Sequence, residues 1–343
     1  MHTIDTIIQH AITGRVFPGA VVLVAQGQRV LHHSAYGKTA YSAIEHLVPQ
    51  VVSTKTIYDI ASLTKMFTAT AALRLIETAE LVIDRPVQHY IAEFAQADVT
   101  IWHLLTHTSG LDLRLSVAAR AGVDALWQAI YRAPLSQQPG AVVSYTNINT
   151  LLLGEVASRI TGMPLDQLLQ ELVLEPLALV ETCFCPPTAW QQRIAPTEID
   201  QWRGGVIHGS VHDESAWVLA GVAGHAGLFS TTQDLHRFCC GWLPESGFLT
   251  AETIAWAQQN HTPGKALACG LGWMRDRPNF MGRAPIGTVG HTGFTGPAML
   301  ILPDMTIVIV LSNRTFPQRP DRSIGKHHDV TAAIVNSVVN LAN

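Results

Sequence analysis

The chain opens with apolar residues at the spacing of one helix face. The members of this face are Ile4, Ile7, Ile8, Ala11 and Ile12. Two apolar runs, residues 20–25 and 29–35, then flank a turn at residues 26–28. Such a pair of runs around a short turn predicts a β-hairpin. We therefore expect an amphipathic helix followed by two antiparallel strands.

The C-terminal part of the chain shows a related pattern. Runs 297–302 and 306–311 flank a turn at residues 303–305, which predicts a second hairpin. Both hairpins consist of nearly continuous apolar residues, as expected for strands that are covered on both faces of a sheet. The opening helix and a closing helix, with Asp329 as its expected cap, would supply part of this cover.

Helical periodicity dominates the middle of the chain, from about residue 62 to residue 245. One apolar face comprises Met66, Ala69, Leu73 and Ile76, and another comprises Leu152, Val156 and Ile160. The predicted fold is α/β (α+β), with an antiparallel sheet built from both termini and flanked by helices. We predict a sheet domain of residues 1–61 and 246–343 and a helical domain of residues 62–245, with the active site in the cleft between them.

Composition narrows the function further. The sequence is 48% hydrophobic and 14% charged, and its net charge is −4. This composition excludes a disordered chain, and the scattered basic residues predict no nucleic-acid or membrane partner. The chain shows no signal peptide or membrane-spanning run, and its five cysteines follow no disulfide spacing. We therefore expect a cytoplasmic protein. No metal-ligand spacing is present, and we predict no metal and no cofactor.

The first candidate for chemistry is Ser62-Leu63-Thr64-Lys65 at a predicted helix start. Residues three apart share a helix face, so the Lys65 amine can reach the Ser62 hydroxyl. A buried amine with a lowered pKa can take the proton that a serine must lose to become a nucleophile. The helix start also offers N–H donors to an oxyanion. A Ser-x-x-Lys pair by itself also occurs on solvated helix faces.

Two further motifs follow in the order that this chemistry needs. Tyr145-Thr146-Asn147 precedes a predicted helix, where a phenol can relay protons and an amide can hold a substrate carbonyl. By itself it is also compatible with a turn and a helix cap. His291-Thr292-Gly293-Phe294 lies on a predicted strand, where the Phe294 amide could be a second oxyanion donor beside that of Ser62. By itself this motif is also compatible with a glycine-rich turn.

Together these motifs resemble those of the serine β-lactamase-like superfamily, which pairs Ser-x-x-Lys with downstream Ser-Asp-Asn and Lys-Thr-Gly motifs. The similarity is to the branch of class C β-lactamases, D-alanyl-D-alanine carboxypeptidase penicillin-binding proteins and family VIII esterases. It extends from about residue 19 to residue 313. Further segments that resemble this branch are 84–87, 101–111, 211–214 and 221–230.

The resemblance implies a role for each motif residue. Ser62 resembles the acylated serine, Lys65 its base, Tyr145 the tyrosine that shares proton transfer, and Asn147 a substrate-binding amide. The strand of His291, Thr292 and Gly293 would bind substrate. His291 stands where many relatives have lysine. A neutral imidazole offers less fixed positive charge to a substrate carboxylate than a lysine does.

The expected function is a serine hydrolase that forms an acyl-enzyme with a small-molecule or peptide substrate. Esters and peptidoglycan-fragment peptides or amides are the favoured substrates. A modest class C-like β-lactamase and a penicillin-binding sensor that deacylates slowly remain open alternatives. Among the other polar residues, His103, His107 and Glu155 are expected to be structural, whereas His212 and His225 could line the cleft. The sequence does not predict the oligomeric state.

Overall fold

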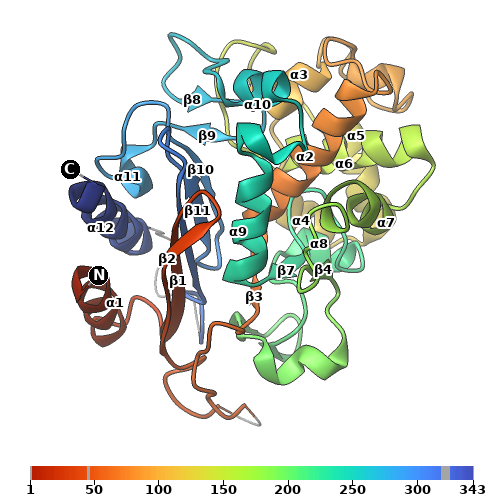
Figure 1. The fold of residues 1–343 in the computed structure, drawn as a ribbon. Coiled ribbons are helices and arrows are strands. Elements are labelled where there is room, and N and C mark those ends of the chain that lie inside the picture. Colours follow the sequence, from red (N-terminus) through yellow and green to blue (C-terminus); the bar gives the residue numbers. More distant parts are fainter. Residues whose placement is uncertain (1, 45–46, 318–324, 343) are drawn as a thin grey trace.

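The computed structural model describes residues 2–44, 47–317 and 325–342. These residues form a seven-stranded antiparallel sheet at the centre of the sheet-forming half of the molecule (Figure 1). The two ends of the chain supply its strands, as the sequence predicted. In spatial order the strands are β2 (Arg29–Gly37), β1 (Gly19–Gln26), β12 (Thr306–Ser312), β11 (Ala298–Ile301), β10 (Val289–Thr292), β9 (Met274–Arg275) and β8 (Ala268–Cys269).

Both predicted hairpins are present, and the first and last thirds of the chain meet between them. Strand β1 pairs with β2 on one side and with β12 on the other, where Leu23 lies opposite Ile309. Strand β12 continues to β11, so the two hairpins lie edge to edge. This pairing joins residues nearly 300 positions apart in the sequence and fixes the two ends of the chain in one layer.

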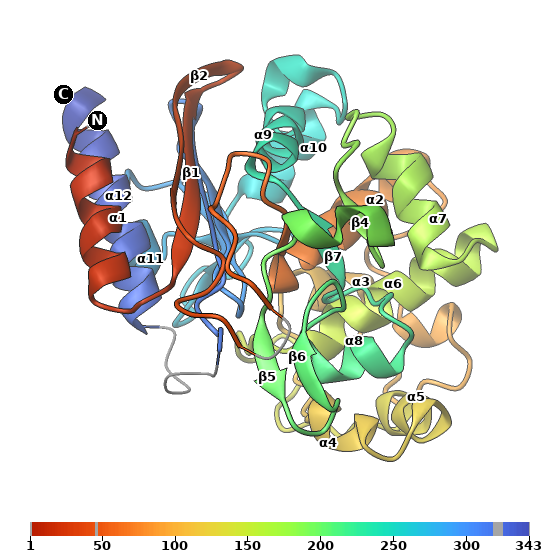
Figure 2. The ribbon, with the colours of Figure 1, turned by 90° about the horizontal axis from the view of Figure 1, so that it is seen from below.

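The sheet is covered on both faces, which explains why its strands are apolar at almost every position. Helices α1 (His2–Thr13), α11 (Pro278–Met281) and α12 (Gly325–Ala342) cover one face, and Figure 2 shows α1 and α12 side by side there. Successive strand residues point to opposite faces. Val22 and Leu300 accordingly join the core beneath these helices, whereas Leu23 and Met299 join the core shared with the helical region.

The expected cap at Asp329 is wrong. Helix α12 already begins at Gly325, so Asp329 lies in its second turn. A carboxylate near the start of a helix is favoured by the helix dipole as well as by capping, so the same residue type fits either position.

The other side of the sheet packs against a mainly helical region. Its central helix is α2 (Thr64–Glu77), whose residues from Thr64 to Leu73 are all buried. The sequence predicted a helix with one apolar face, but its alanines and threonines are small enough to be enclosed on every side. The described helices around it are α3 (Ile101–Leu105), α4 (Leu115–Ala119), α5 (Val123–Tyr131), α6 (Asn147–Thr161), α7 (Leu165–Leu169), α8 (Glu214–Val218), α9 (Thr232–Gly241) and α10 (Ala251–Gln258).

Five short strands in this region were not predicted, because two or three residues are too few to show an alternating pattern. They are β3 (Tyr58–Asp59), β4 (Cys183–Phe184), β5 (Glu198–Asp200), β6 (Gly205–Ile207) and β7 (Leu228–Ser230). Strand β3 pairs with β7 immediately before Ser62. Nowhere in the described ranges is there a helix both long and apolar enough to cross a membrane. The domain boundaries remain a prediction.

Replacing Leu300 by Ala should lower the free energy of unfolding by about 2–5 kcal/mol, because it leaves a cavity between the sheet and its outer helices. Urea denaturation followed by circular dichroism would measure the change. Ile286→Ala is the control, since this side chain is 89% exposed and its loss should cost less than about 0.5 kcal/mol. Equal effects of the two substitutions would contradict the assigned core.

Candidate active site

Ser62 lies in a tight turn between strand β3 and the first residue of helix α2. The chain forms one 3₁₀ turn over Ala61–Leu63, and α2 begins at Thr64. Ser62 lines a cavity of about 420 Å³ together with Tyr145, Asn147, His212 and Phe294. The hydroxyl is therefore accessible to a molecule in this cavity, at the N-terminal end of a long buried helix.

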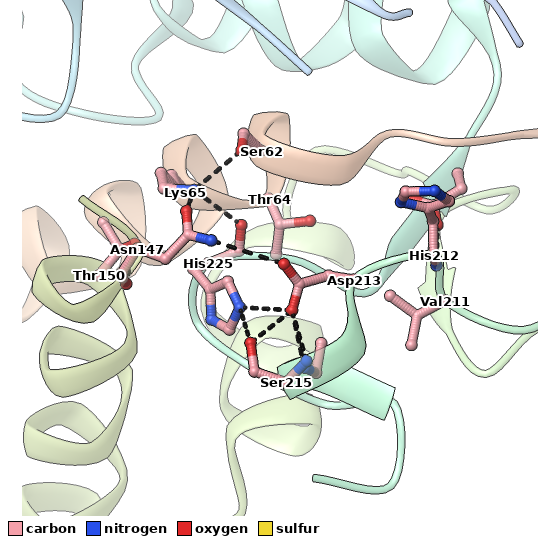
Figure 3. A network of polar contacts seen from close by, with 12 residues as sticks. Ser62, Thr64, Lys65, Asn147, Thr150, Val211, His212, Asp213, Ser215 and His225 are labelled. Carbon is pink, nitrogen blue, oxygen red and sulfur yellow. Dashed lines mark hydrogen bonds and ion pairs between the residues drawn. The ribbon is translucent and has the colours of Figure 1, made fainter. Parts of the chain in front are cut away.

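Lys65 is the centre of the polar network at this turn (Figure 3). Its Nζ donates to Ser62 Oγ at 2.9 Å, to Asn147 Oδ1 at 2.9 Å and to the carbonyl oxygen of His225 at 3.1 Å. Lys65 is fully buried, and burial lowers its pKa to about 7, although the charge of Asp213 acts in the opposite direction. A substantial fraction of this amine is thus neutral at neutral pH and able to accept a proton.

Tyr145 precedes α6 and lies beside Ser62 and Lys65. The centre of its ring is 5.1 Å from Lys65 Nζ. Tyr145 is 41% exposed as a whole, but desolvation of its phenol at the site raises the pKa above the usual value, and interaction with the Ser62 hydroxyl lowers it by less. The rings of His107 and His291 lie at 5.0 and 5.7 Å from the Tyr145 ring. These two contacts fix the ring plane and so the direction of the phenol.

Asn147 begins α6 but does not cap it. The residue at the cap position, Thr146, makes no capping bond, and the Asn147 side chain points toward Lys65. Its Nδ2 donates to Asp213 Oδ2 at 3.5 Å. The two ends of one amide therefore connect the buried amine to a carboxylate, which favours the chemical interpretation of this motif over a helix cap.

Asp213 belongs to the segment 211–214 that resembles the family, but no role of its own was predicted for it from the sequence. It caps α8, where Oδ1 accepts from Ser215 N at 3.0 Å and Ala216 N at 2.9 Å. The same oxygen lies 3.0 Å from His225 Nε2. Burial alone would raise the pKa of Asp213, but His225 and these hydrogen bonds hold it well below its usual range. The sequence Asp213-Glu214-Ser215-Ala216 indicates a helix cap. It does not reveal that the capping carboxylate lies near Lys65.

The predicted substrate strand has a mixed outcome. Phe294 lines the cavity, but His291 is fully buried and Thr292 is 8% exposed, and neither forms part of the cavity wall. Burial lowers the pKa of His291 far below its usual value, so its imidazole is neutral. Gly293 packs against the turn of Ser62: a Cβ there would lie 2.7 Å from the Ile60 carbonyl oxygen. Direct contact of His291, Thr292 and Gly293 with substrate stays a prediction.

The remaining candidates have separate positions. His212 lines the cavity and stacks on Phe294, with ring centres 5.6 Å apart, whereas the His225 ring is buried behind Asp213. His103 completes a capping box with Thr100, as expected for a structural residue. Glu155 forms an ion pair with Arg159 at 2.7 Å, away from the site.

The chain is similar in sequence to several known proteins. A family model described as "Beta-lactamase" matches residues 4–333. A protein of Escherichia coli K12 described as a putative D-alanyl-D-alanine carboxypeptidase is 33% identical, over 87% of this chain and 79% of that protein. A protein of Salmonella agona with the same description is 30% identical, over 92% of this chain and 82% of that protein.

Solved structures share the fold at lower identity. EstCE1, described as a hydrolase with promiscuous acyltransferase activity, has a TM-score of 0.75 and 23% identity, over 96% of this chain and 98% of that chain. A class C β-lactamase of Rhodobacter sphaeroides has a TM-score of 0.75 and 20% identity, over 99% of this chain and all of its own. The chain therefore belongs to the β-lactamase family and is a hydrolase of the β-lactamase fold.

Proposed function

We propose that the chain hydrolyses esters or small peptide-like amides through an acyl-enzyme on Ser62. The observation that carries this proposal is the fully buried Lys65 amine, with a pKa of about 7, at 2.9 Å from the Ser62 hydroxyl. A serine needs a base close to its hydroxyl, and a base is most effective when its pKa is near the working pH.

In the first half-reaction, neutral Lys65 takes the proton of Ser62 as Oγ forms a bond to the substrate carbonyl carbon. The resulting oxyanion accepts hydrogen bonds from the amides of Ser62 and Phe294. The intermediate then collapses, the bond to the leaving group breaks, and the leaving group takes a proton. In the second half-reaction water attacks the acyl-enzyme, and the same proton transfers run in reverse.

The pKa values divide the proton-handling work between Lys65 and Tyr145. Lys65 is the resting base, since its pKa lies near neutrality. The pKa of Tyr145 is raised by burial, so the phenol is protonated at rest and acts as the donor to the leaving group. The Lys65 ammonium formed in the first step lies 5.1 Å from the Tyr145 ring centre and stabilises the phenolate that this donation would leave. In deacylation the Tyr145 phenolate takes a proton from the attacking water, and Lys65 returns its proton to Ser62 Oγ as the acyl bond breaks, which restores the starting state.

The cavity favours a neutral acyl group. The strand beside Ser62 carries a buried, neutral His291, so it provides no fixed cation for a substrate carboxylate. Two acidic residues, Asp213 and Glu214, line the same cavity and disfavour an anion there. We therefore rank esters above β-lactams, which carry a carboxylate next to the reacting ring.

A second candidate is a D-alanyl-D-alanine carboxypeptidase. The description of the relatives in E. coli and Salmonella favours it. In addition, exposed Arg114 lines the cavity and could attract the terminal carboxylate of such a peptide. Arg114 directly precedes α4, whose first residue, Leu115, also lines the cavity.

A substrate panel tests the proposed function. It contains nitrophenyl acetate, nitrophenyl butyrate, a chromogenic cephalosporin and a D-Ala-D-Ala peptide. We expect the wild type to hydrolyse the esters fastest and Ser62→Ala to lose about 10³-fold or more of kcat. Faster turnover of the D-Ala-D-Ala peptide than of the esters would support the second candidate. Full ester hydrolysis by the Ser62→Ala variant would contradict an acyl-enzyme on this serine.

The charge of Asp213 should set the pH at which Lys65 becomes active. Since only the neutral amine accepts a proton, kcat/KM should rise with pH through about 7. Asp213 favours the charged amine, so Asp213→Asn should lower the pKa of Lys65 and move the acid limb to lower pH. Ester hydrolysis between pH 5 and 9 measures this. Asp234→Asn, a buried carboxylate on α9, is the control. An acid limb that stays in place or moves upward in Asp213→Asn would exclude this coupling.

A binding role can be separated from hydrolysis by intact mass. The enzyme is incubated with benzylpenicillin, and the protein mass and free penicillin are followed together. Because Asp213 and Glu214 line the cavity and His291 is neutral, we expect little acylation and little loss of drug. A lasting adduct on Ser62 would instead identify a sensor, and drug loss without a lasting adduct would identify a β-lactamase.

A further inference from the structure

Asp59 is a buried carboxylate next to the site that the mechanism above does not use. It ends strand β3, three residues before Ser62, and is 1% exposed. Each carboxylate oxygen accepts one backbone N–H: Oδ1 from Ala61 at 2.8 Å and Oδ2 from His212 at 2.6 Å. Across the described parts of the chain, no lysine or arginine forms an ion pair with it. Its partners are thus two peptide groups from segments about 150 residues apart.

The first of these contacts holds an unfavourable backbone conformation. Ala61 has a φ of 45°, a left-handed conformation that side chains other than glycine rarely adopt. The Ala61 N–H is the donor to Asp59, and the next residue is Ser62. The carboxylate therefore stabilises the bend that directs the Ser62 hydroxyl and its amide toward the cavity.

Asp59 also contacts the segment that carries the second expected oxyanion donor. The main-chain carbonyl oxygen of Asp59 accepts a hydrogen bond from Thr295 Oγ1 at 2.9 Å, and Thr295 directly follows Phe294. In addition, the ring of His212 stacks on Phe294 at 5.6 Å with an angle of 29° between the planes. Because Asp59 binds the His212 N–H, it supports Phe294 from two sides.

We propose that Asp59 is a positioning residue that sets the separation between the Ser62 and Phe294 amides, and hence the fit of the oxyanion site. This inference rests on the acyl-enzyme function proposed above. A carboxylate suits the task because it accepts two N–H groups with two equivalent oxygens. An asparagine could accept only one of them, and its NH₂ group would oppose the other.

Asp59→Asn should therefore lower kcat for nitrophenyl butyrate about 10- to 100-fold and leave KM within about threefold, since the oxyanion forms only in the transition state. Phenylboronic acid forms a tetrahedral anion on a serine, so its affinity should fall in parallel with kcat. A merely structural defect would lower the active fraction and leave the affinity for phenylboronic acid unchanged.

Asp234→Asn is the matched control. Asp234 is also 1% exposed and accepts from the backbone N–H of Glu181 at 2.7 Å and from Thr182 Oγ1 at 2.9 Å. It connects segments outside the cavity, so its replacement should change kcat and the affinity for phenylboronic acid by less than about threefold. Equal values of both quantities in the two variants would overturn the role of Asp59.

A second variant covers the case in which Asp59→Asn does not fold. Thr295→Val keeps the side-chain shape and removes only the hydrogen bond to Asp59 O. It should lower kcat several-fold at unchanged KM, and wild-type kcat would overturn the inference.

Labelling of Ser62 by a fluorophosphonate distinguishes failure of the proposed function from failure of the role of Asp59. No label on the wild type contradicts the proposed function and this inference with it, whereas equally fast labelling of wild type and Asp59→Asn contradicts the inference alone.

Discussion

The hydrogen bond between the Lys65 amine and the Ser62 hydroxyl is the interaction on which the rest of the site depends. A lysine enclosed by protein loses the water that stabilises its charge. The neutral form of the amine becomes relatively more stable, and the pKa of Lys65 falls to about 7. The negative charge of Asp213 acts in the opposite direction and favours the charged amine. Asn147 Oδ1 and the His225 carbonyl oxygen accept hydrogen bonds from the same Nζ and hold it in place. The amine is thus held near the midpoint of its titration, where it can both take and return a proton.

The fold supplies each member of this arrangement from a different element. Lys65 comes from the central helix α2, Asn147 from the start of α6, and the His225 carbonyl from the chain that precedes β7. The long helix α2 can be buried on all sides because alanine and threonine alternate with its larger residues, and this burial is what lowers the pKa of Lys65. Phe294, which follows strand β10 of the sheet, also lines the cavity. The chemistry of the site is therefore a consequence of how the helical region and the sheet pack together.

Much of the fold and part of the site could be predicted from the sequence. The hairpins showed as apolar runs around turns, and the i, i+3 spacing of Ser62 and Lys65 indicated their contact. The role of the His225 backbone could not be predicted, because every residue has a carbonyl and the sequence does not reveal which one is near Lys65. Ala61 gives no warning of its positive φ, since alanine usually avoids it. Asp59 and Asp213 were missed for a related reason: their partners are backbone groups or residues far away in the sequence.

The state of the Lys65 amine can be measured without reference to any substrate. The sequence has only five lysines, so ¹³C labelling at Cε gives a spectrum in which each can be followed from pH 5 to 11. We expect one resonance to titrate near pH 7 in the wild type and to be missing from Lys65→Arg. If no lysine resonance titrated near pH 7 in a protein that still hydrolyses an ester, a neutral Lys65 base would be contradicted, because Lys65 would then be charged when it had to accept the proton.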